Sequence, residues 1–233
     1  GLGKRGLRRG ARRGGRADGR RDAEGPGDAP AQRRPPDAVR RHVAADVVAT
    51  LEVVAPGAPV TLVGHSLGGR VGLAVAARAP TRLRELVLLD IAPGAIDPRI
   101  SESRRVLDVL LALPDEAPDR RAFRTLLIDA GLSPALADWV LMNVRTEPDR
   151  ATWRIDRRAM DALHDAFNRV DLWPIVEQRL VPLRCARGGR SRYVTDADAA
   201  RLEAAGCEVL TLPEAGHYVH VDALEPLVAW LSR

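Results

Sequence analysis

The stretch VTLVGHSLGGRVGLAVAARAP, residues 60–80, decides the fold of this chain. It begins as an apolar, β-branched segment, which favours a strand, and it ends as an alanine-rich segment, which favours a helix. The turn between them, residues 64–68, reads GHSLG, a G-x-S-x-G pattern in the strand, turn and helix context of a nucleophile elbow. Because glycines leave room for a strained serine, we expect the turn to present the Ser66 hydroxyl as a nucleophile and the Leu67 N–H as an oxyanion donor.

Strand and helix patterns alternate on both sides of this stretch. Residues 37–97 and 171–233 have the order of a doubly wound, mostly parallel α/β sheet. Residues 98–170 show helical patterns and no convincing strand, so we expect a helical insertion there. The expected strands are 59–63, 85–90, 181–187 and 207–212; the expected helices are 37–54, 70–80, 196–206 and 221–231 around the sheet, and 100–113, 119–131, 133–144 and 156–170 in the insertion.

A nucleophilic serine needs a histidine as its base. His217 follows the last expected strand in a loop and comes after the serine in the chain, as the last member of such a triad does. His220 is its rival, three residues further on, where a surface or capping role is favoured. His42 and His164 fall within helical patterns, which favours solvent-facing or structural roles. We therefore predict that His217 is the base.

The acid of the triad has more than one candidate. Asp90 ends the strand 85–90, which we expect to pair beside the elbow strand, so its carboxylate could orient the imidazole. Asp196 and Asp198 follow the strand 181–187, but they stand at the start of a helix, where capping explains an aspartate. Asp90 is preferred, with Asp196 as the first alternative.

The charge of the chain is unevenly distributed. Residues 1–36 hold eleven Lys or Arg against four Asp or Glu, a balance of +7, whereas the formal net charge is +5, so residues 37–233 carry −2. No aromatic residue interleaves with the Arg-Gly-rich segment, so we interpret it as a disordered or non-native tail and expect no nucleic-acid partner. An RNA-binding arm is the alternative.

Other features of the composition bear on location and cofactors. No apolar run approaches a membrane span, and the first 36 residues hold too few apolar residues for a signal peptide. Cys185 and Cys207 fall in expected adjacent strands, where free thiols behave as small apolar groups. We expect a cytoplasmic protein, and triad chemistry that requires neither a metal nor an organic cofactor.

Several stretches together resemble the α/β-hydrolase superfamily, and within it the bacterial broad-specificity acyl esterases related to mitochondrial α/β-hydrolase-domain proteins. These stretches are GHSLGGR (64–70), LVLLDIAP (86–93), WRID (153–156), GGRSRYV (188–194) and AGHYVH (215–220). The resemblance implies hydrolysis of a small acyl ester or thioester through an acyl-enzyme on Ser66. It also assigns the acid of the DIAP segment to Asp90, because the G-x-x-D position usual in the superfamily reads Gly188 to Ser191 here and holds a serine.

The resemblance also makes residues 98–170 a helical lid. The side chains that would then line an acyl pocket are Leu107, Leu110, Leu111, Leu126, Leu127, Trp139 and Leu141, unless they pack the lid against itself. A non-catalytic or degenerate fragment, a cofactor-free haloperoxidase and a C–C hydrolase remain alternative functions. No oligomeric state is predicted.

The N-terminal part departs from the family. Its opening strands, and the His-Gly segment that supplies a second oxyanion donor, are not visible in residues 1–36. We therefore expect an α/β-hydrolase fold that is incomplete at this end, as in a truncated or frame-shifted product. The strand at 59–63 is then expected to form an exposed edge of the sheet.

Overall fold

The computed structural model describes residues 36–98 and 101–233. The tail predicted for residues 1–36 lies outside the described residues, except for Pro36, which begins the first helix. Across the two described ranges, no helix combines the length and the apolar character needed to cross a bilayer.

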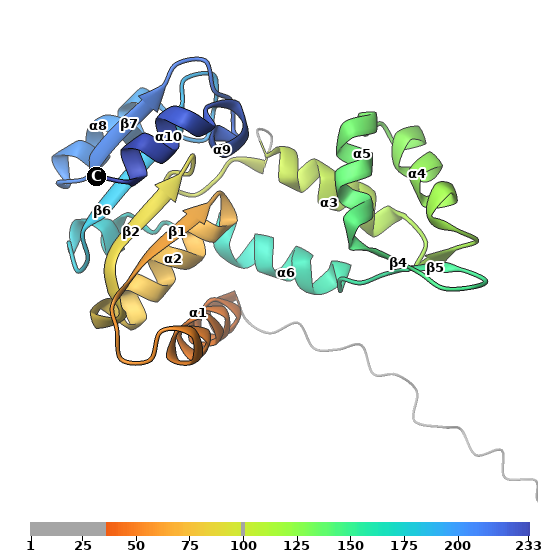
Figure 1. The fold of residues 1–233 in the computed structure, drawn as a ribbon, viewed down its shortest axis with the longest axis horizontal. Coiled ribbons are helices and arrows are strands. Elements are labelled where there is room, and N and C mark those ends of the chain that lie inside the picture. The colour runs from red at the N-terminus through yellow and green to blue at the C-terminus, as the bar shows by residue number, and fades with distance from the viewer. Residues whose placement is uncertain (1–35, 99–100) are drawn as a thin grey trace, which may run out of the picture. The chain divides into compact units, whose positions relative to one another are not determined.

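Four parallel strands form the main sheet, in the order β1-β2-β6-β7 (Figure 1). They are β1 (Val60–His65), β2 (Leu83–Leu89), β6 (Leu183–Gly188) and β7 (Glu208–Leu212). The helices that connect or flank them are α1 (Pro36–Val54), α2 (Leu67–Arg78), α7 (Trp173–Glu177), α8 (Asp196–Ala204), α9 (Val219–Asp222) and α10 (Leu224–Leu231). The predicted doubly wound parallel sheet is confirmed.

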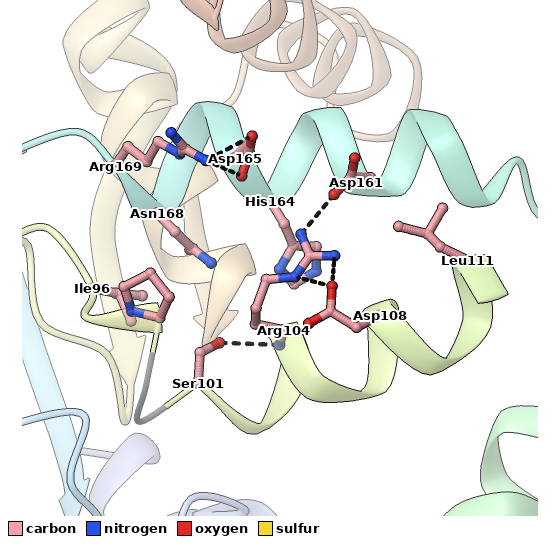
Figure 2. Close-up of a pocket in the computed structure, with 11 residues that line it drawn as sticks. Ile96, Ser101, Arg104, Asp108, Leu111, Asp161, His164, Asp165, Asn168 and Arg169 are labelled. Atoms are coloured by element: carbon pink, nitrogen blue, oxygen red, sulfur yellow. Dashed lines mark hydrogen bonds and ion pairs between the residues drawn. The ribbon is translucent and has the colours of Figure 1, made fainter. Parts of the chain in front are cut away.

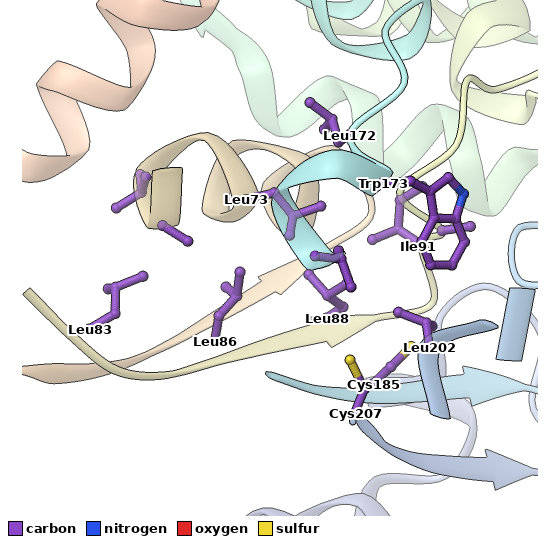
Figure 3. Close-up of a cluster of buried hydrophobic side chains, with 14 of the residues drawn as sticks. Leu73, Leu83, Leu86, Leu88, Ile91, Leu172, Trp173, Cys185, Leu202 and Cys207 are labelled. Carbon is purple, nitrogen blue, oxygen red and sulfur yellow. The ribbon is translucent and has the colours of Figure 1, made fainter. Parts of the chain in front are cut away.

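Side chains of β2 alternate between two cores, because successive residues of a strand point to opposite faces of the sheet. Leu86 and Leu88 belong to a core that also contains Leu73 of α2 (Figure 3). Val87 and Leu89 belong to a second core on the other face, with Trp230 of α10. Since each fully buried aliphatic side chain contributes about 1.5–3 kcal/mol, the two cores hold β2 firmly in the middle of the sheet.

Among the described residues, β1 forms one edge of the sheet. Its burial pattern alternates, and Val63 is 45% exposed. The expected edge position is therefore confirmed, because within the described residues β1 pairs only with β2, on one side.

The inserted segment contains four helices, each begun by a capping side chain that accepts a hydrogen bond from the first turn. Its own apolar core includes Phe123, Leu127 and Val140. The helices are α3 (Glu102–Ala112), α4 (Arg120–Asp129), α5 (Pro134–Val140) and α6 (Arg157–Asn168). All four were predicted.

The prediction that this segment has no strand was wrong. A small antiparallel sheet, in the order β3-β5-β4, lies among its helices. The strands are β3 (Glu116–Ala117), β4 (Val144–Thr146) and β5 (Ala151–Trp153). Two or three residues are too few to display a period of two, so the sequence pattern could not reveal them.

The C-terminal helix and the cysteines also differ from expectation in detail. The helix predicted at 221–231 is divided into α9 and α10 at Ala223, whose φ of −144° is not helical. Short helix α7 was not predicted. Cys185 lies on β6, Cys207 directly precedes β7, and both thiols are free and buried.

Candidate active site

Ser66 stands between the last residue of β1 and the first residue of α2. Its φ of 53° and ψ of −122° lie in a region that non-glycine residues rarely adopt. Its N–H donates to the Leu89 carbonyl of β2 at 3.0 Å, and its carbonyl accepts from the Gly69 N–H at 2.9 Å. These bonds on both sides hold the strained turn and lift the side chain above the end of the sheet.

The glycines of the elbow do not all serve the same purpose. A Cβ on Gly64 would lie 2.5 Å from the Gly69 nitrogen, and a Cβ on Gly69 would lie 2.6 Å from the Ile91 side chain. A Cβ on Gly68 would meet nothing within 4 Å. The close approach of strand and helix therefore requires glycine at 64 and 69, whereas the second glycine of the G-x-S-x-G pattern has free space around it.

Asp90 leaves the sheet beside Ser66. The register of β1 and β2 pairs His65 with Leu89, so the next residue of each strand emerges at the same edge. Asp90 is fully buried and has a φ of 50°. Its Oδ1 accepts from the Gly188 N–H at 2.9 Å. The Gly188 N–H therefore helps to hold the carboxylate at the carboxyl ends of the central strands.

His217 reaches the same place from the loop after β7. Its Nδ1 lies 2.7 Å from Asp90 Oδ2, and its Nε2 lies 3.0 Å from Ser66 Oγ. A carboxylate can only accept, so Nδ1 carries the proton and Nε2 accepts from the serine hydroxyl. The three residues that the sequence brought forward as nucleophile, acid and base thus form one continuous hydrogen-bonded chain.

The loop that carries His217 is tied to the elbow strand. His65 Nε2 donates to the His217 carbonyl at 2.9 Å, and the two rings lie 4.7 Å apart. Burial lowers the pKa of His65, and the charges of His217 and His220 act in the same direction, whereas the hydrogen bond to the His217 carbonyl and the charge of Asp90 oppose the shift. The role of His65 was not predicted, because a histidine beside the serine of an elbow has no spacing signal of its own.

The rival residues lie elsewhere. Asp196 is the first residue of α8, with its side chain 96% exposed and paired with Arg187 at 2.7 Å. Asp198 completes a capping box with Thr195. His220 is exposed on α9. The geometry therefore favours Asp90 over Asp196 and His217 over His220 as partners of the serine.

The other two histidines lie on helices, as expected. His42 is exposed on α1. His164 lies on α6, where its Nδ1 is buried without a partner among the described residues. Neither ring contacts Ser66 in the part of the chain that the structure describes.

Two residues of the loop after β6 reach the site without having been predicted. Ser191 Oγ donates a short hydrogen bond to Asp90 Oδ2, the same oxygen that His217 contacts. The ring of Tyr193 is stacked on the His217 imidazole, with the centroids 4.0 Å apart and the planes at 26°. The serine at the G-x-x-D position was the available signal for Ser191; Tyr193 had none.

Leu67, the expected oxyanion donor, is the first residue of α2. The N–H of this residue has no acceptor within the helix, so it is free to donate to another group. The positive end of the helix dipole also lies at the serine. The location suits the role expected of it.

Arg70 joins three parts of the chain beneath the site. Its side chain is fully buried and donates five hydrogen bonds of 2.6–2.9 Å. Burial lowers the pKa of Arg70 to about 10. The acceptors are the carbonyls of Ala92, Gly94, Phe167 and Val170. Helix α2, the loop after Asp90 and the end of α6 are therefore held together by one guanidinium group.

A cavity of about 420 Å³ lies between α3 and α6 (Figure 2). Its charged groups are already paired: Arg104 contacts Asp108 and Asp161, each at 2.6 Å, and Arg169 lies 3.2 Å from Asp165. Ser66, Asp90 and His217 are not part of its lining.

For several of the residues predicted to line an acyl pocket, the structure favours the alternative that they pack the insertion against itself. Of the seven apolar residues named for that pocket, only Leu111 lines this cavity. Leu110, Leu127 and Leu141 pack within the core of the insertion, and Trp139 is 57% exposed. The side chains bury one another, which is how a small helical segment obtains a core of its own.

Comparison with known proteins agrees with this fold. Esterase Rv0045c of Mycobacterium tuberculosis is 31% identical over 187 residues, which cover 76% of this chain and 61% of that protein. The mouse sn-1-specific diacylglycerol lipase ABHD11 is 26% identical over 173 residues, covering 70% of this chain and 55% of the relative. This chain therefore spans less than two thirds of the length of these relatives.

The solved structure of a marine microorganism esterase superposes with a TM-score of 0.68 at 22% identity, covering 85% of this chain and 77% of that one. The model of the alpha/beta hydrolase family matches residues 9–230, a range that includes part of the segment predicted to be a tail. The chain belongs to the alpha/beta hydrolase family.

Proposed function

We propose that the protein is a serine hydrolase that cleaves small carboxylic esters or thioesters through an acyl-enzyme. The observation that carries this proposal is the position of His217, 3.0 Å from the Ser66 hydroxyl and 2.7 Å from the Asp90 carboxylate. This geometry supplies a nucleophile, a base and a group that orients the base. The names of the relatives, an esterase and a lipase, support the same chemistry.

In the proposed reaction, Ser66 Oγ attacks the acyl carbon while His217 Nε2 takes the hydroxyl proton. Asp90 holds the Nδ1 proton and stabilises the imidazolium that forms. The Leu67 N–H donates to the oxyanion. His217 then gives its proton to the leaving alkoxide or thiolate, and a water molecule, activated by the same nitrogen, releases the acid from Ser66.

We further propose that residues 98–170 act as a lid over the site. Two connections between the helices of this segment and the site support this proposal. Arg70 bonds the end of α6 to α2, the helix that follows Ser66, and the Glu102 N–H at the start of α3 donates to the Tyr193 hydroxyl. A segment attached to the core at both ends beside the triad is well placed to cover a bound ester.

The two free, buried thiols support the proposed reducing location in the cytoplasm.

Labelling with a fluorophosphonate probe tests the proposed function, because the probe reacts with activated serines whatever the natural substrate. We expect the full chain to be labelled, and Ser66→Ala to abolish labelling. Ser101→Ala is the matched control: Ser101 is also buried, but it caps α3 and lies in no triad.

Asp90→Asn and Asp196→Asn extend the test to the acid. Loss of the Asp90 carboxylate is expected to lower kcat by about 10⁴-fold, as for the aspartate of comparable triads, whereas Asp196→Asn should react like the wild type. A folded wild-type chain that is not labelled would instead favour the non-catalytic fragment. If the chain is labelled, hydrolysis of p-nitrophenyl esters of increasing acyl length would define its substrate range.

A further inference from the structure

Tyr193 lies at the junction of the triad and the insertion. It belongs to the loop between β6 and α8, and its side chain is half-buried. One end of this side chain contacts His217, and the other end contacts the first residue of α3. Of the tyrosines in the described part of the chain, only Tyr193 makes both contacts.

The ring of Tyr193 covers one face of the His217 imidazole. The centroids are 4.0 Å apart and the planes are inclined by only 26°. Both nitrogens of His217 can hold their partners only in one orientation of the ring plane, because Ser66 and Asp90 lie on opposite sides of the imidazole. A stacked neighbour opposes rotation out of this plane and also favours the imidazolium formed when Ser66 loses its proton.

The hydroxyl of Tyr193 makes the second contact. It accepts a hydrogen bond from the Glu102 N–H at 3.1 Å. Glu102 is the first residue of α3, and its N–H is one of those that a helix leaves without an internal acceptor. The tyrosine oxygen therefore connects the start of the insertion to the imidazole through a rigid ring.

The backbone of Tyr193 is also held on the catalytic side. Its N–H donates to Ser191 Oγ at 3.2 Å, and its carbonyl accepts from the Ala92 N–H at 3.2 Å. Ser191 in turn donates to Asp90. Because these bonds attach the backbone of Tyr193 to the acid and its loop, this backbone cannot shift without disturbing neighbours of Asp90.

We propose that Tyr193 is a positioning residue with two separable tasks: its ring holds the His217 imidazole in the orientation required for proton transfer, and its hydroxyl fastens α3 beside the site. The consequence for catalysis rests on the proposed function, whereas the two contacts do not. Removing the hydroxyl affects the insertion, and removing the ring affects the histidine.

Two variants of the full chain separate these tasks. Tyr193→Phe keeps the ring and removes the acceptor of the Glu102 N–H; Tyr193→Leu removes both. Tyr218→Leu is the matched control, because the Tyr218 ring meets His217 edge-on at 5.4 Å rather than face to face. Melting temperatures and amide NMR spectra establish which variants are folded.

NMR reports both contacts without any need for activity. In the wild type, the ring current of Tyr193 should move the ring-proton signals of His217 upfield, with His217→Gln used to assign them. Tyr193→Phe should keep this shift and accelerate hydrogen exchange of the Glu102 amide. Tyr193→Leu should lose the shift as well, and Tyr218→Leu should keep slow exchange at Glu102.

Ester hydrolysis then tests the catalytic consequence. Tyr193→Leu is expected to lower kcat by about 3- to 10-fold, the worth of an aromatic pair, while Tyr193→Phe raises KM and leaves kcat nearly unchanged. If Tyr193→Leu does not fold, Tyr193→Phe and Tyr193→Trp carry the test, and Tyr193→Trp should preserve kcat.

The results distinguish the positioning role of Tyr193 from the proposed hydrolase function. His217 signals that are the same in the wild type and Tyr193→Leu, or a Glu102 amide that exchanges equally in the wild type and Tyr193→Phe, would overturn the assignment of Tyr193. A wild-type chain that shows both NMR effects but no Ser66-dependent labelling would overturn the proposed function and leave the positioning geometry supported.

Discussion

Ser191 Oγ and His217 Nδ1 converge on the same oxygen of Asp90, Oδ2. Asp90 Oδ1 accepts from the Gly188 N–H, so the buried carboxylate has partners on both oxygens. Each of these donors helps to hold the carboxylate in place. Ser191 occupies the position at which most of the superfamily has an aspartate. Here it supports the acid Asp90, which follows the neighbouring strand β2 of the sheet.

Replacement of Ser191 by alanine should weaken this support without removing the acid. Hydrogen bonds to charged groups are worth about 1.5–3 kcal/mol, so kcat of Ser191→Ala is expected to fall by about 10-fold or more. Ser191→Thr keeps the hydroxyl and should recover most of the activity. Equal rates for Ser191→Ala and the wild type in p-nitrophenyl ester hydrolysis would show that the bond has no role in catalysis.

The shared contact also predicts that the acid can be moved. Asp90→Asn should lose about 10⁴-fold in kcat, because the amide no longer holds the required tautomer of His217. Adding Ser191→Asp places a carboxylate next to the same oxygen position and should restore part of the rate. The measurement is kcat of the single and double variants; a double variant no faster than Asp90→Asn would contradict the prediction.

The G-x-S-x-G motif contains both Gly64 and Gly68, but only Gly64 lacks room for a Cβ. The two glycines can therefore be tested against each other. Gly64→Ala should prevent correct folding, since its Cβ would collide with the backbone of Gly69. Gly68→Ala meets free space and lies in the first turn of α2, so it should be neutral or stabilising by up to about 1 kcal/mol. Urea unfolding measures both; a severe loss of stability in Gly68→Ala would be the contrary result.

Ser66, Asp90 and His217 could be brought together from the sequence because each follows a strand with a clear apolar pattern. Parallel strands end at one edge of a sheet, so their following residues meet there. The contacts of Ser191 and Tyr193 could not be predicted in this way, because the loop that holds them has no period. The three strands of the insertion escaped notice because they are two or three residues long.

The burial of Arg70 could not be predicted from the sequence pattern either. An arginine in a helix is usually exposed, yet packing buries this one completely among backbone carbonyls. The alternatives left open for the leucines of the insertion show a related limit: an apolar side chain indicates burial, but the sequence does not say which side chains bury it. Both depend on tertiary contacts between segments far apart in the chain.

Arg70→Met is therefore expected to be strongly destabilising. It would leave four carbonyl groups without their donor, and each buried acceptor left unsatisfied costs about 1–3 kcal/mol. Arg78→Met, at an exposed position of the same helix, should change stability by less than about 0.5 kcal/mol. The free energy of unfolding in urea checks both, and similar values for the two variants would contradict the proposed role of Arg70.

His164 should make the stability depend on pH. Burial lowers the pKa of His164, and the positive charge of Arg104 lowers it further, while Asp161 and Asp165 oppose the shift. Between this lowered pKa and the ordinary value of 6.5, the unfolded chain binds more protons at this residue than the folded chain does. The contribution is therefore fully present above pH 6.5 and decreases as the pH falls through that window.

The free energies of unfolding at about pH 7.5 and about pH 5.5 test this dependence. His164→Gln should lose less stability on acidification than the wild type does, because one of the groups with a lowered pKa is gone. The half-buried His65, whose pKa burial also lowers, should preserve part of the dependence. His42→Gln, an exposed change on α1, should follow the wild type; if His164→Gln follows it equally, His164 does not control the acid sensitivity.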